Sequence, residues 1–180
     1  RTITFLGLKS STSESYEQET VTLNGGTVTT TSTWWRINRA FVETAGSGGQ
    51  NAGLITLRSS SNTSFIFATI VAGLNQSNVC AYAVPSNNTA LIKNVATNFT
   101  IAAGSTKTTT EYSNITLRIR EPGGVFRSRL TFTSSLDVPR IFSLKGGIRV
   151  PENSDIKIRV ESVSEDNSIV AGSFEYLLLE

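Results

Sequence analysis

Apolar and polar residues alternate along most of this chain. Runs in which every second residue is apolar are separated by short segments rich in Gly, Asn, Ser and Pro. This period-two pattern places apolar side chains on one face of a strand and polar side chains on the other. No stretch of helical length carries an apolar stripe with helical spacing. The pattern therefore predicts an all-β protein.

Thirteen runs are predicted to be strands, and many short strands separated by turns are typical of sandwiches and jelly rolls. The predicted strands are 2–9, 17–23, 27–31, 34–44, 53–59, 65–70, 78–84, 90–100, 114–120, 126–133, 140–144, 156–162 and 173–179. We expect a β-sandwich of jelly-roll type, built as one or two subdomains.

Glycine-rich turns join several of these strands. Asn24-Gly25-Gly26 predicts a hairpin between 17–23 and 27–31, because both Gly and Asn tolerate a positive φ. Pro122-Gly123-Gly124 predicts a second hairpin between 114–120 and 126–133. The segment 46–51 is predicted to be a longer loop.

The character of the strands changes within residues 73–85. Threonine-rich hairpins precede this stretch, whereas the strands after it have basic residues on one face, as in Leu117-Arg118-Ile119-Arg120 and Ile156-Lys157-Ile158-Arg159. We therefore expect a Thr-rich hairpin subdomain over 1–76 and a jelly-roll-like sandwich over 77–180. A single sandwich built from both halves is the alternative, because no segment between them reads as a linker.

The residue types present exclude most catalytic chemistry. The 180 residues include no histidine and one cysteine, so imidazole-based acid–base relays and clustered thiolate metal sites are absent from the sequence. We expect no enzyme activity, no cofactor and no metal site. Cys80 lies in the apolar run Val79-Cys80-Ala81-Tyr82 and is expected to be a buried structural thiol.

The charge is nearly balanced, with a formal net charge of +2. Residues 1–90 have five basic and four acidic residues, and residues 91–180 have eleven and ten. Such a balance indicates solvated faces or ionic contacts between subunits, and predicts binding to neither nucleic acid nor membrane. No apolar run approaches the length of a membrane span. Because the chain opens inside a predicted strand without Met, we expect residues to precede Arg1.

Trp34 and Trp35 are the most conspicuous aromatic residues. Neighbouring residues on a strand point to opposite faces, so at most one of these two side chains is expected at the surface. The alternation then places Arg36 on the same face as Trp34. We interpret the pair as core or subunit-interface packing, with sugar stacking as the alternative.

The turn and strand motifs along nearly the whole chain resemble a group of tailed-bacteriophage virion structural proteins. The matching segments are 19–25 (ETVTLNG), 28–31 (VTTT), 36–42 (RINRAFV), 45–53 (AGSGGQNAG), 82–85 (YAVP), 122–127 (PGGVFR) and 150–156 (VPENSDI). The resemblance implies an all-β component of a virus particle, made in the host cytoplasm. These motifs concern turns and strands and do not mark a catalytic site.

Within that group, the expected role is a capsid cement or decoration protein on the capsid surface. Its partners would be the major capsid protein and two further copies of itself in a homotrimer. Trp34, Trp35, Arg36, Arg118, Arg120, Arg127 and Arg129 are the candidate interface residues. The alternative is a receptor- or glycan-binding module of a tail or fibre, in which a tryptophan and Asn-rich loops form the contact surface.

Overall fold

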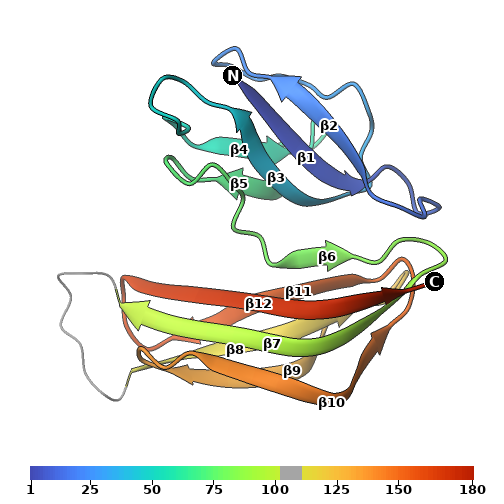
Figure 1. Ribbon diagram of the computed structural model, residues 1–180, viewed down its shortest axis with the longest axis vertical. Helices are drawn as coiled ribbons and strands as arrows, with labels where there is room; N and C mark the ends of the chain where they lie inside the picture. Colours follow the sequence, from blue (N-terminus) through green and yellow to red (C-terminus); the bar gives the residue numbers. More distant parts are fainter. Residues whose placement is uncertain (102–110) are drawn as a thin grey trace. The chain divides into compact units, whose positions relative to one another are not determined.

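The computed structural model describes residues 1–101 and 111–180, which form twelve β-strands and no helix (Figure 1). The predicted all-β class is therefore confirmed. The described residues divide into two compact units, Arg1–Val79 and Cys80–Glu180, here called unit 1 and unit 2. The boundary predicted from the sequence lay between residues 76 and 77.

Unit 1 contains a three-stranded antiparallel sheet and a two-stranded ribbon (Figure 1). The sheet has the order β2-β1-β3, formed by β1 (Thr2–Leu8), β2 (Glu17–Thr22) and β3 (Arg36–Thr44). The ribbon pairs β4 (Ile55–Arg58) with β5 (Ile66–Ile70). Residues 75–77 add main-chain hydrogen bonds to β3, from Val42 N to the Asn75 carbonyl and from Ser77 N to the Ala40 carbonyl.

The core of unit 1 is small. Six buried side chains from the sheet and the ribbon form its hydrophobic cluster: Ile3, Phe5, Ala40, Leu57, Ala68 and Ile70. Partly buried residues pack around them, among them Val21, Trp34, Ile37 and Val42. The period-two pattern of β1 explains this arrangement, because alternate side chains of a strand meet one face.

Two sequence predictions in unit 1 are wrong. Residues 27–31 form no strand, so the hairpin predicted at Asn24-Gly25-Gly26 does not form, and β2 pairs with β1 instead. A tight turn is still present, because Gly25 has a φ of 86° and the Asn24 side chain accepts a hydrogen bond from Gly26 N at 2.9 Å. Beyond it, the main chain of Thr31 donates to the Glu19 carboxylate rather than to a neighbouring strand.

Unit 2 is a sandwich of two antiparallel sheets, which Figure 1 shows as two layers. One sheet has the order β10-β7-β12, from β7 (Thr89–Ile101), β10 (Arg140–Val150) and β12 (Ser168–Leu179). The other has the order β6-β11-β8-β9, from β6 (Ala81–Ala83), β8 (Tyr112–Arg120), β9 (Arg127–Ser135) and β11 (Asp155–Val163). This arrangement is a β-sandwich and does not confirm the narrower jelly-roll prediction.

The core of unit 2 lies between its two sheets. Strand β7 is the centre of one sheet, and its inward side chains are buried at every second position over most of its length. Strand β8 supplies the opposing layer. Their inward apolar residues are Ala90, Ile92, Val95, Phe99 and Ile101 on β7, and Ile115, Leu117 and Ile119 on β8, all exposed by 3% or less. This packing is the reason that long period-two runs were recognisable in the sequence.

The predicted hairpin at Pro122-Gly123-Gly124 is confirmed, since β8 and β9 pair in antiparallel register around it. Strand β10 runs six residues past its predicted end at residue 144. Gly146 and Gly147 interrupt the alternation there, and both have positive φ angles, of 81° and 74°. The ladder with β7 shifts register across this bulge and then continues, so the strand persists where the pattern breaks.

Candidate functional site

The tryptophan pair of unit 1 lies just before a strand rather than within one. Strand β3 begins at Arg36, although the Trp35 main-chain N–H still bonds to the Leu8 carbonyl at 2.9 Å. The Trp34 ring packs edge-on against Phe5, with ring centroids 5.1 Å apart, and borders the core cluster. The guanidinium of Arg36 lies over the Trp35 ring at 4.2 Å. Both indoles are thus half-buried and held by neighbours from unit 1.

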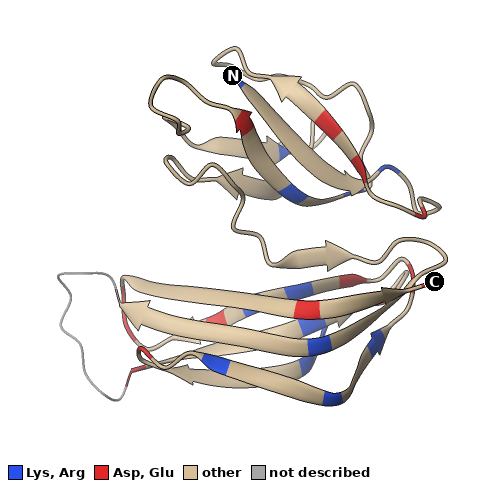
Figure 2. Cartoon of the chain, viewed as in Figure 1, with Lys and Arg blue, Asp and Glu red and all other residues tan. Residues whose placement is uncertain are grey.

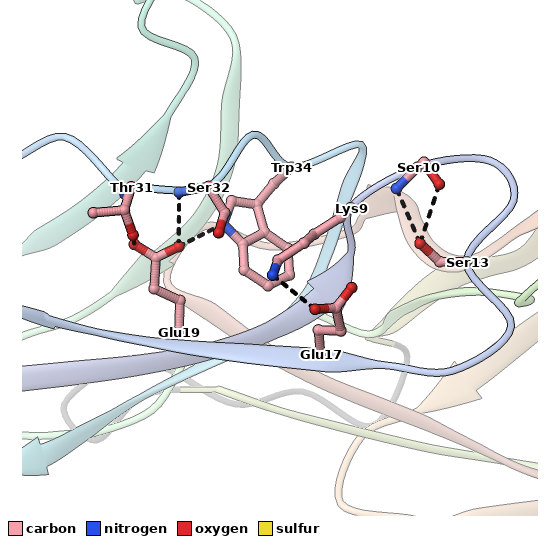
Figure 3. Close-up of polar contacts among 8 residues, drawn as sticks. All are labelled: Lys9, Ser10, Ser13, Glu17, Glu19, Thr31, Ser32 and Trp34. Carbon is pink, nitrogen blue, oxygen red and sulfur yellow. Dashed lines mark hydrogen bonds and ion pairs between the residues drawn. The ribbon is translucent and has the colours of Figure 1, made fainter.

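Glu19 on β2 holds the segment that leads to Trp34 (Figure 3). Its carboxylate accepts hydrogen bonds from the main-chain N–H groups of Thr31 at 2.7 Å and Ser32 at 3.1 Å. It also accepts from the Thr31 hydroxyl at 2.8 Å and from Trp34 Nε1 at 3.3 Å. Desolvation alone would raise the pKa of Glu19, but these hydrogen bonds outweigh it and lower the pKa. Sequence reasoning missed Glu19, because nothing in the local pattern marks a contact twelve residues away.

An open groove runs along unit 1. Its volume is about 1460 Å³. Apolar side chains of the core form part of its wall, including Ile3, Phe5 and Leu57. Residues 25–33, 44–48, 50–54 and 59–61 supply most of the rest, and many of these are Thr, Ser or Gly. The side chains that hold unit 1 together therefore also line a space that the unit leaves open.

A charged face covers the outer side of the β6-β11-β8-β9 sheet of unit 2. We define it by six outward residues, Arg118 and Arg120 on β8 and Asp155, Lys157, Arg159 and Glu161 on β11. Figure 2 shows basic and acidic residues interleaved on these strands. Each basic or acidic residue alternates with an inward residue, as the sequence pattern predicted.

Ion pairs fix both arginines of β8 on the charged face. Arg118 Nη2 lies 2.7 Å from Glu161 Oε1, and Arg120 Nη2 lies 2.5 Å from Asp155 Oδ2. A second bond joins Arg120 Nε to the same Asp155 oxygen at 2.8 Å. A hydrogen bond from Thr116, together with the nearby guanidinium groups, lowers the pKa of Glu161 against a smaller opposing effect of desolvation.

Arg127 and Arg129 are not brought together with the other two arginines. Across the ladder, Arg127 pairs with Ile119 and Ser128 pairs with Arg118, so Arg127 and Arg118 belong to opposite faces of the sheet. Arg129 lies at the register shift and forms an ion pair with Glu121 at 2.7 Å. The four arginines grouped by the sequence prediction therefore occupy different surroundings.

Lys157 and Phe126 were missed as site residues. Lys157 Nζ lies 3.8 Å from the centroid of the Phe126 ring, and the Arg120 guanidinium lies 4.7 Å from it. Phe126 comes directly before β9. The alternation Ile156-Lys157-Ile158-Arg159 already indicated an outward Lys157, but the position of Phe126 depends on how the 122–124 turn folds back.

The outer side of the other sheet of unit 2 is mostly uncharged. Register places Ile141, Ala96 and Ser173 in one outward row across β10, β7 and β12, and Arg149, Leu91 and Leu177 in another. Ile141, Ile169 and Leu177 are exposed by 73%, 54% and 51%. Exposed apolar side chains of this kind are common at protein contact surfaces.

The remaining chemistry of the chain is sparse. Burial raises the pKa of the Cys80 thiol to about 11, so the reactive thiolate is scarce at neutral pH. Over residues 1–101 and 111–180, no group of three or more acidic, Cys or His side chains is placed to hold a metal ion. No helix able to span a membrane occurs in these same residues.

No protein family, curated protein or solved structure matches the chain. Its function is therefore inferred from its own residues and geometry.

Proposed function

We propose that this chain is a structural protein of a bacteriophage particle. Its narrower role is that of a capsid cement or decoration protein, which stabilises the shell through contacts between subunits. The support is the resemblance of its turns and strands to virion structural proteins, together with surfaces suited to contacts. It would lie on the capsid surface as a homotrimer against the major capsid protein.

The open groove of unit 1 is the observation that carries this proposal. A unit as small as Arg1–Val79 buries a smaller fraction of its surface on folding than a larger domain does, so its core is less easily completed from within. Here the groove is lined by Leu54, whose side chain is 64% exposed, and by the partly buried Val21 and Ile55 at the edge of the core cluster. A partner that fills the groove would complete the core, which is the behaviour expected of a subunit in an assembly.

The energy available from such contacts is sufficient for a cement role. Covering apolar surface stabilises an assembly by roughly 25 cal/mol per Å². The stabilising free energy of a modest patch accumulates when the contact is repeated at many equivalent positions on a shell, since each copy is held by several neighbours at once. The outer face of the β10-β7-β12 sheet, with Ile141 and Leu177 exposed, offers a second patch for contact between copies.

The contacts of Trp34 favour this role over receptor or glycan binding. A sugar platform needs an exposed aromatic face, whereas the Trp34 ring packs on Phe5 and its Nε1 donates to Glu19. Lys9 Nζ lies 5.7 Å from the same ring. These contacts make Trp34 a packing residue of unit 1.

The proposal is tested by counting copies of this chain in purified virus particles. Quantitative mass spectrometry against the major capsid protein gives the ratio directly. We expect a ratio of the same order as the major capsid protein or one third of it. A count of only a few copies per particle would place the chain at a vertex or tail and favour receptor binding. Absence from the particle would overturn both roles.

A further inference from the structure

The charged face of unit 2 carries an excess of positive charge around Lys157. Four of its six defining residues are basic and two are acidic. Both carboxylates pair with arginines: Asp155 binds Arg120, and Glu161 binds Arg118 at 2.7 Å and lies 3.7 Å from Arg159. Lys157 has no carboxylate at ion-pair distance among the described residues. The positive charge of Lys157 therefore lacks a direct counter-ion within the part of the chain that the structure describes.

The strand register increases this excess. Lys157 lies directly opposite Arg118 in the β11–β8 ladder. Like charges at directly opposite positions destabilise a sheet, so this pairing costs stability. Desolvation is the largest cause of a lowered pKa at Lys157, and three neighbouring guanidinium groups add to it against a smaller opposing effect of Asp155. The three arginines are, in order of effect, Arg159, Arg118 and Arg120.

The cations of this cluster are also held in place. The Phe126 ring makes cation–π contacts with both Lys157 Nζ and the Arg120 guanidinium. Arg118 is fixed through Nε to Thr116 Oγ1 at 3.3 Å and through Nη2 to Glu161. These contacts use two of the three guanidinium nitrogens, and a guanidinium has five N–H donors in total. A carboxylate arriving at the cluster would find donors already oriented.

We propose that Lys157, Arg118 and Arg159 form a binding site for the carboxylates of an acidic segment on a partner protein. The partner's carboxylates would supply the counter-ion that Lys157, opposite Arg118 in the β11–β8 ladder, does not find within the described part of this chain. This inference deepens the proposed function, on which the choice of a protein partner rests, by giving the chemistry of the contact surface on the shell.

The interleaved acids favour a carboxylate segment over a nucleic acid. A phosphate backbone needs a continuous basic track along several phosphates. Here Asp155 and Glu161 lie on β11 to either side of Lys157 and Arg159, and their negative charges would repel a long polyanion. Discrete carboxylates can lie between these acids and bind Lys157 together with Arg118 and Arg159.

The test is a titration of the full-length chain with a hexaglutamate peptide at low salt, followed through amide chemical shifts by NMR. We expect saturable shifts confined to β8, β11 and the surroundings of Phe126, weakening as salt is added. Lys157→Gln should weaken binding about tenfold, as loss of a hydrogen bond to a charged group does. Lys157→Arg should retain it.

Matched controls separate this site from general basicity. Lys145 is an exposed lysine on β10 of the other sheet, and Lys145→Gln should leave binding unchanged. Arg159→Gln, at a side chain that is 54% exposed and lies 3.7 Å from Glu161, should also weaken binding. A hexaglutamine peptide should produce no saturable shifts.

Three results would overturn the inference. One is the absence of saturable shifts, or shifts spread equally over Lys145 and the other basic residues. Another is equal affinity of Lys157→Gln and the unaltered chain. The third is tighter binding of a single-stranded oligonucleotide of equal charge, which would identify a nucleic-acid surface. None of these results depends on the composition of the virus particle. The peptide titration can therefore disprove the carboxylate site while the cement role stands, and the copy count can disprove the cement role while the carboxylate site stands.

Discussion

Unit 1 and unit 2 use the same strand pattern but complete their cores to different extents. In unit 2 two sheets face each other, and the inward residues of β7 and β8 are exposed by 3% or less. In unit 1 a three-stranded sheet meets a two-stranded ribbon, and six buried residues form the cluster beside an open groove. Alternation alone thus predicts strands, but a second full sheet is needed to close a core.

This difference suggests a division of roles. Unit 2 has a closed interior, so its outer faces are available to carry charge on one side and exposed apolar residues on the other. Unit 1 leaves Leu54, which lines its groove, 64% exposed, and a partner in the groove would cover this side chain. Each prediction below either breaks one of the two cores or measures how firmly a segment of it is held.

The largest effect is expected from opening the core of unit 2. Phe99 on β7 is fully buried, and Phe99→Ala should lower the free energy of unfolding by about 3–5 kcal/mol, because a cavity replaces the ring. Urea denaturation followed by far-UV circular dichroism, with amide exchange in β7 and β8, measures this loss. Phe65→Ala in unit 1, where the side chain is 57% exposed, should change the free energy by about 0.5 kcal/mol or less. Equal losses for both variants would contradict the account of a closed core in unit 2.

A smaller loss is expected at the bulge of β10. A methyl group at Gly147 would lie 2.6 Å from Leu91 Cδ1 and 3.0 Å from the Ile92 carbonyl oxygen. Gly147→Ala should therefore destabilise the chain by about 2–4 kcal/mol, combining overpacking with a strained positive φ.

Gly146 provides the matched control for this variant. It also has a positive φ, but a methyl group there would meet nothing within 4 Å. Gly146→Ala should lower the free energy of unfolding by only about 1–2 kcal/mol, which is the cost of a Cβ at a residue with positive φ. If thermal denaturation shows Gly146→Ala to be the more damaging of the two, the packing of Leu91 against the bulge is not as described.

The smallest effect is expected in unit 1, at Glu19. Glu19→Gln should lower the free energy of unfolding by about 1 kcal/mol and shift tryptophan emission, because the segment 31–34 loses its charged hydrogen-bond acceptor. Both tryptophans lie in unit 1, so emission reports on this unit's own segment. Glu17→Gln is the control: Glu17 pairs with Lys9 at 2.7 Å, but both side chains are substantially exposed, so little change is expected.

Acid should reproduce the Glu19 effect. The pKa of Glu19 is lowered in the folded state from its ordinary value of 4.5. Its contribution is therefore fully present above pH 4.5 and is lost as the pH falls through the lowered folded value. An acid titration of tryptophan emission should show this transition in the unaltered chain and not in Glu19→Gln. A transition of the same size in both would assign it to another group.

The local pattern predicted most of the fold, and it failed where distant side chains decide the outcome. Period-two runs predicted β1, β7, β8 and β11 and the hairpin between β8 and β9. Residues 27–31 have the same pattern, yet no strand forms, and the main chain of Thr31 binds Glu19. At the bulge of β10 the opposite happens, because two glycines break the alternation while pairing with β7 resumes.

The sequence likewise predicted only part of the candidate site. The outward positions of Arg118 and Arg120 follow from alternation. Arg127 and Arg129 flank the same hairpin, but their surroundings differ from those of Arg118 and Arg120, because the β8–β9 ladder shifts register at Leu117/Arg118. Lys157 opposite Arg118, and the Phe126 ring beneath it, depend on strand pairing and on a turn, neither of which single-residue patterns specify.

The most direct test of the central claim, that partners on the shell complete unit 1, is amide hydrogen exchange of this chain measured both free and in the assembled virus particle. We predict that segments lining the groove, 25–33 and 44–59, exchange rapidly in the free chain and are protected in the particle. Strands β7 and β8 should be protected in both states. Equal exchange of the groove segments in the free and assembled states would contradict the account, because the open core of unit 1 would then have no partner on the shell.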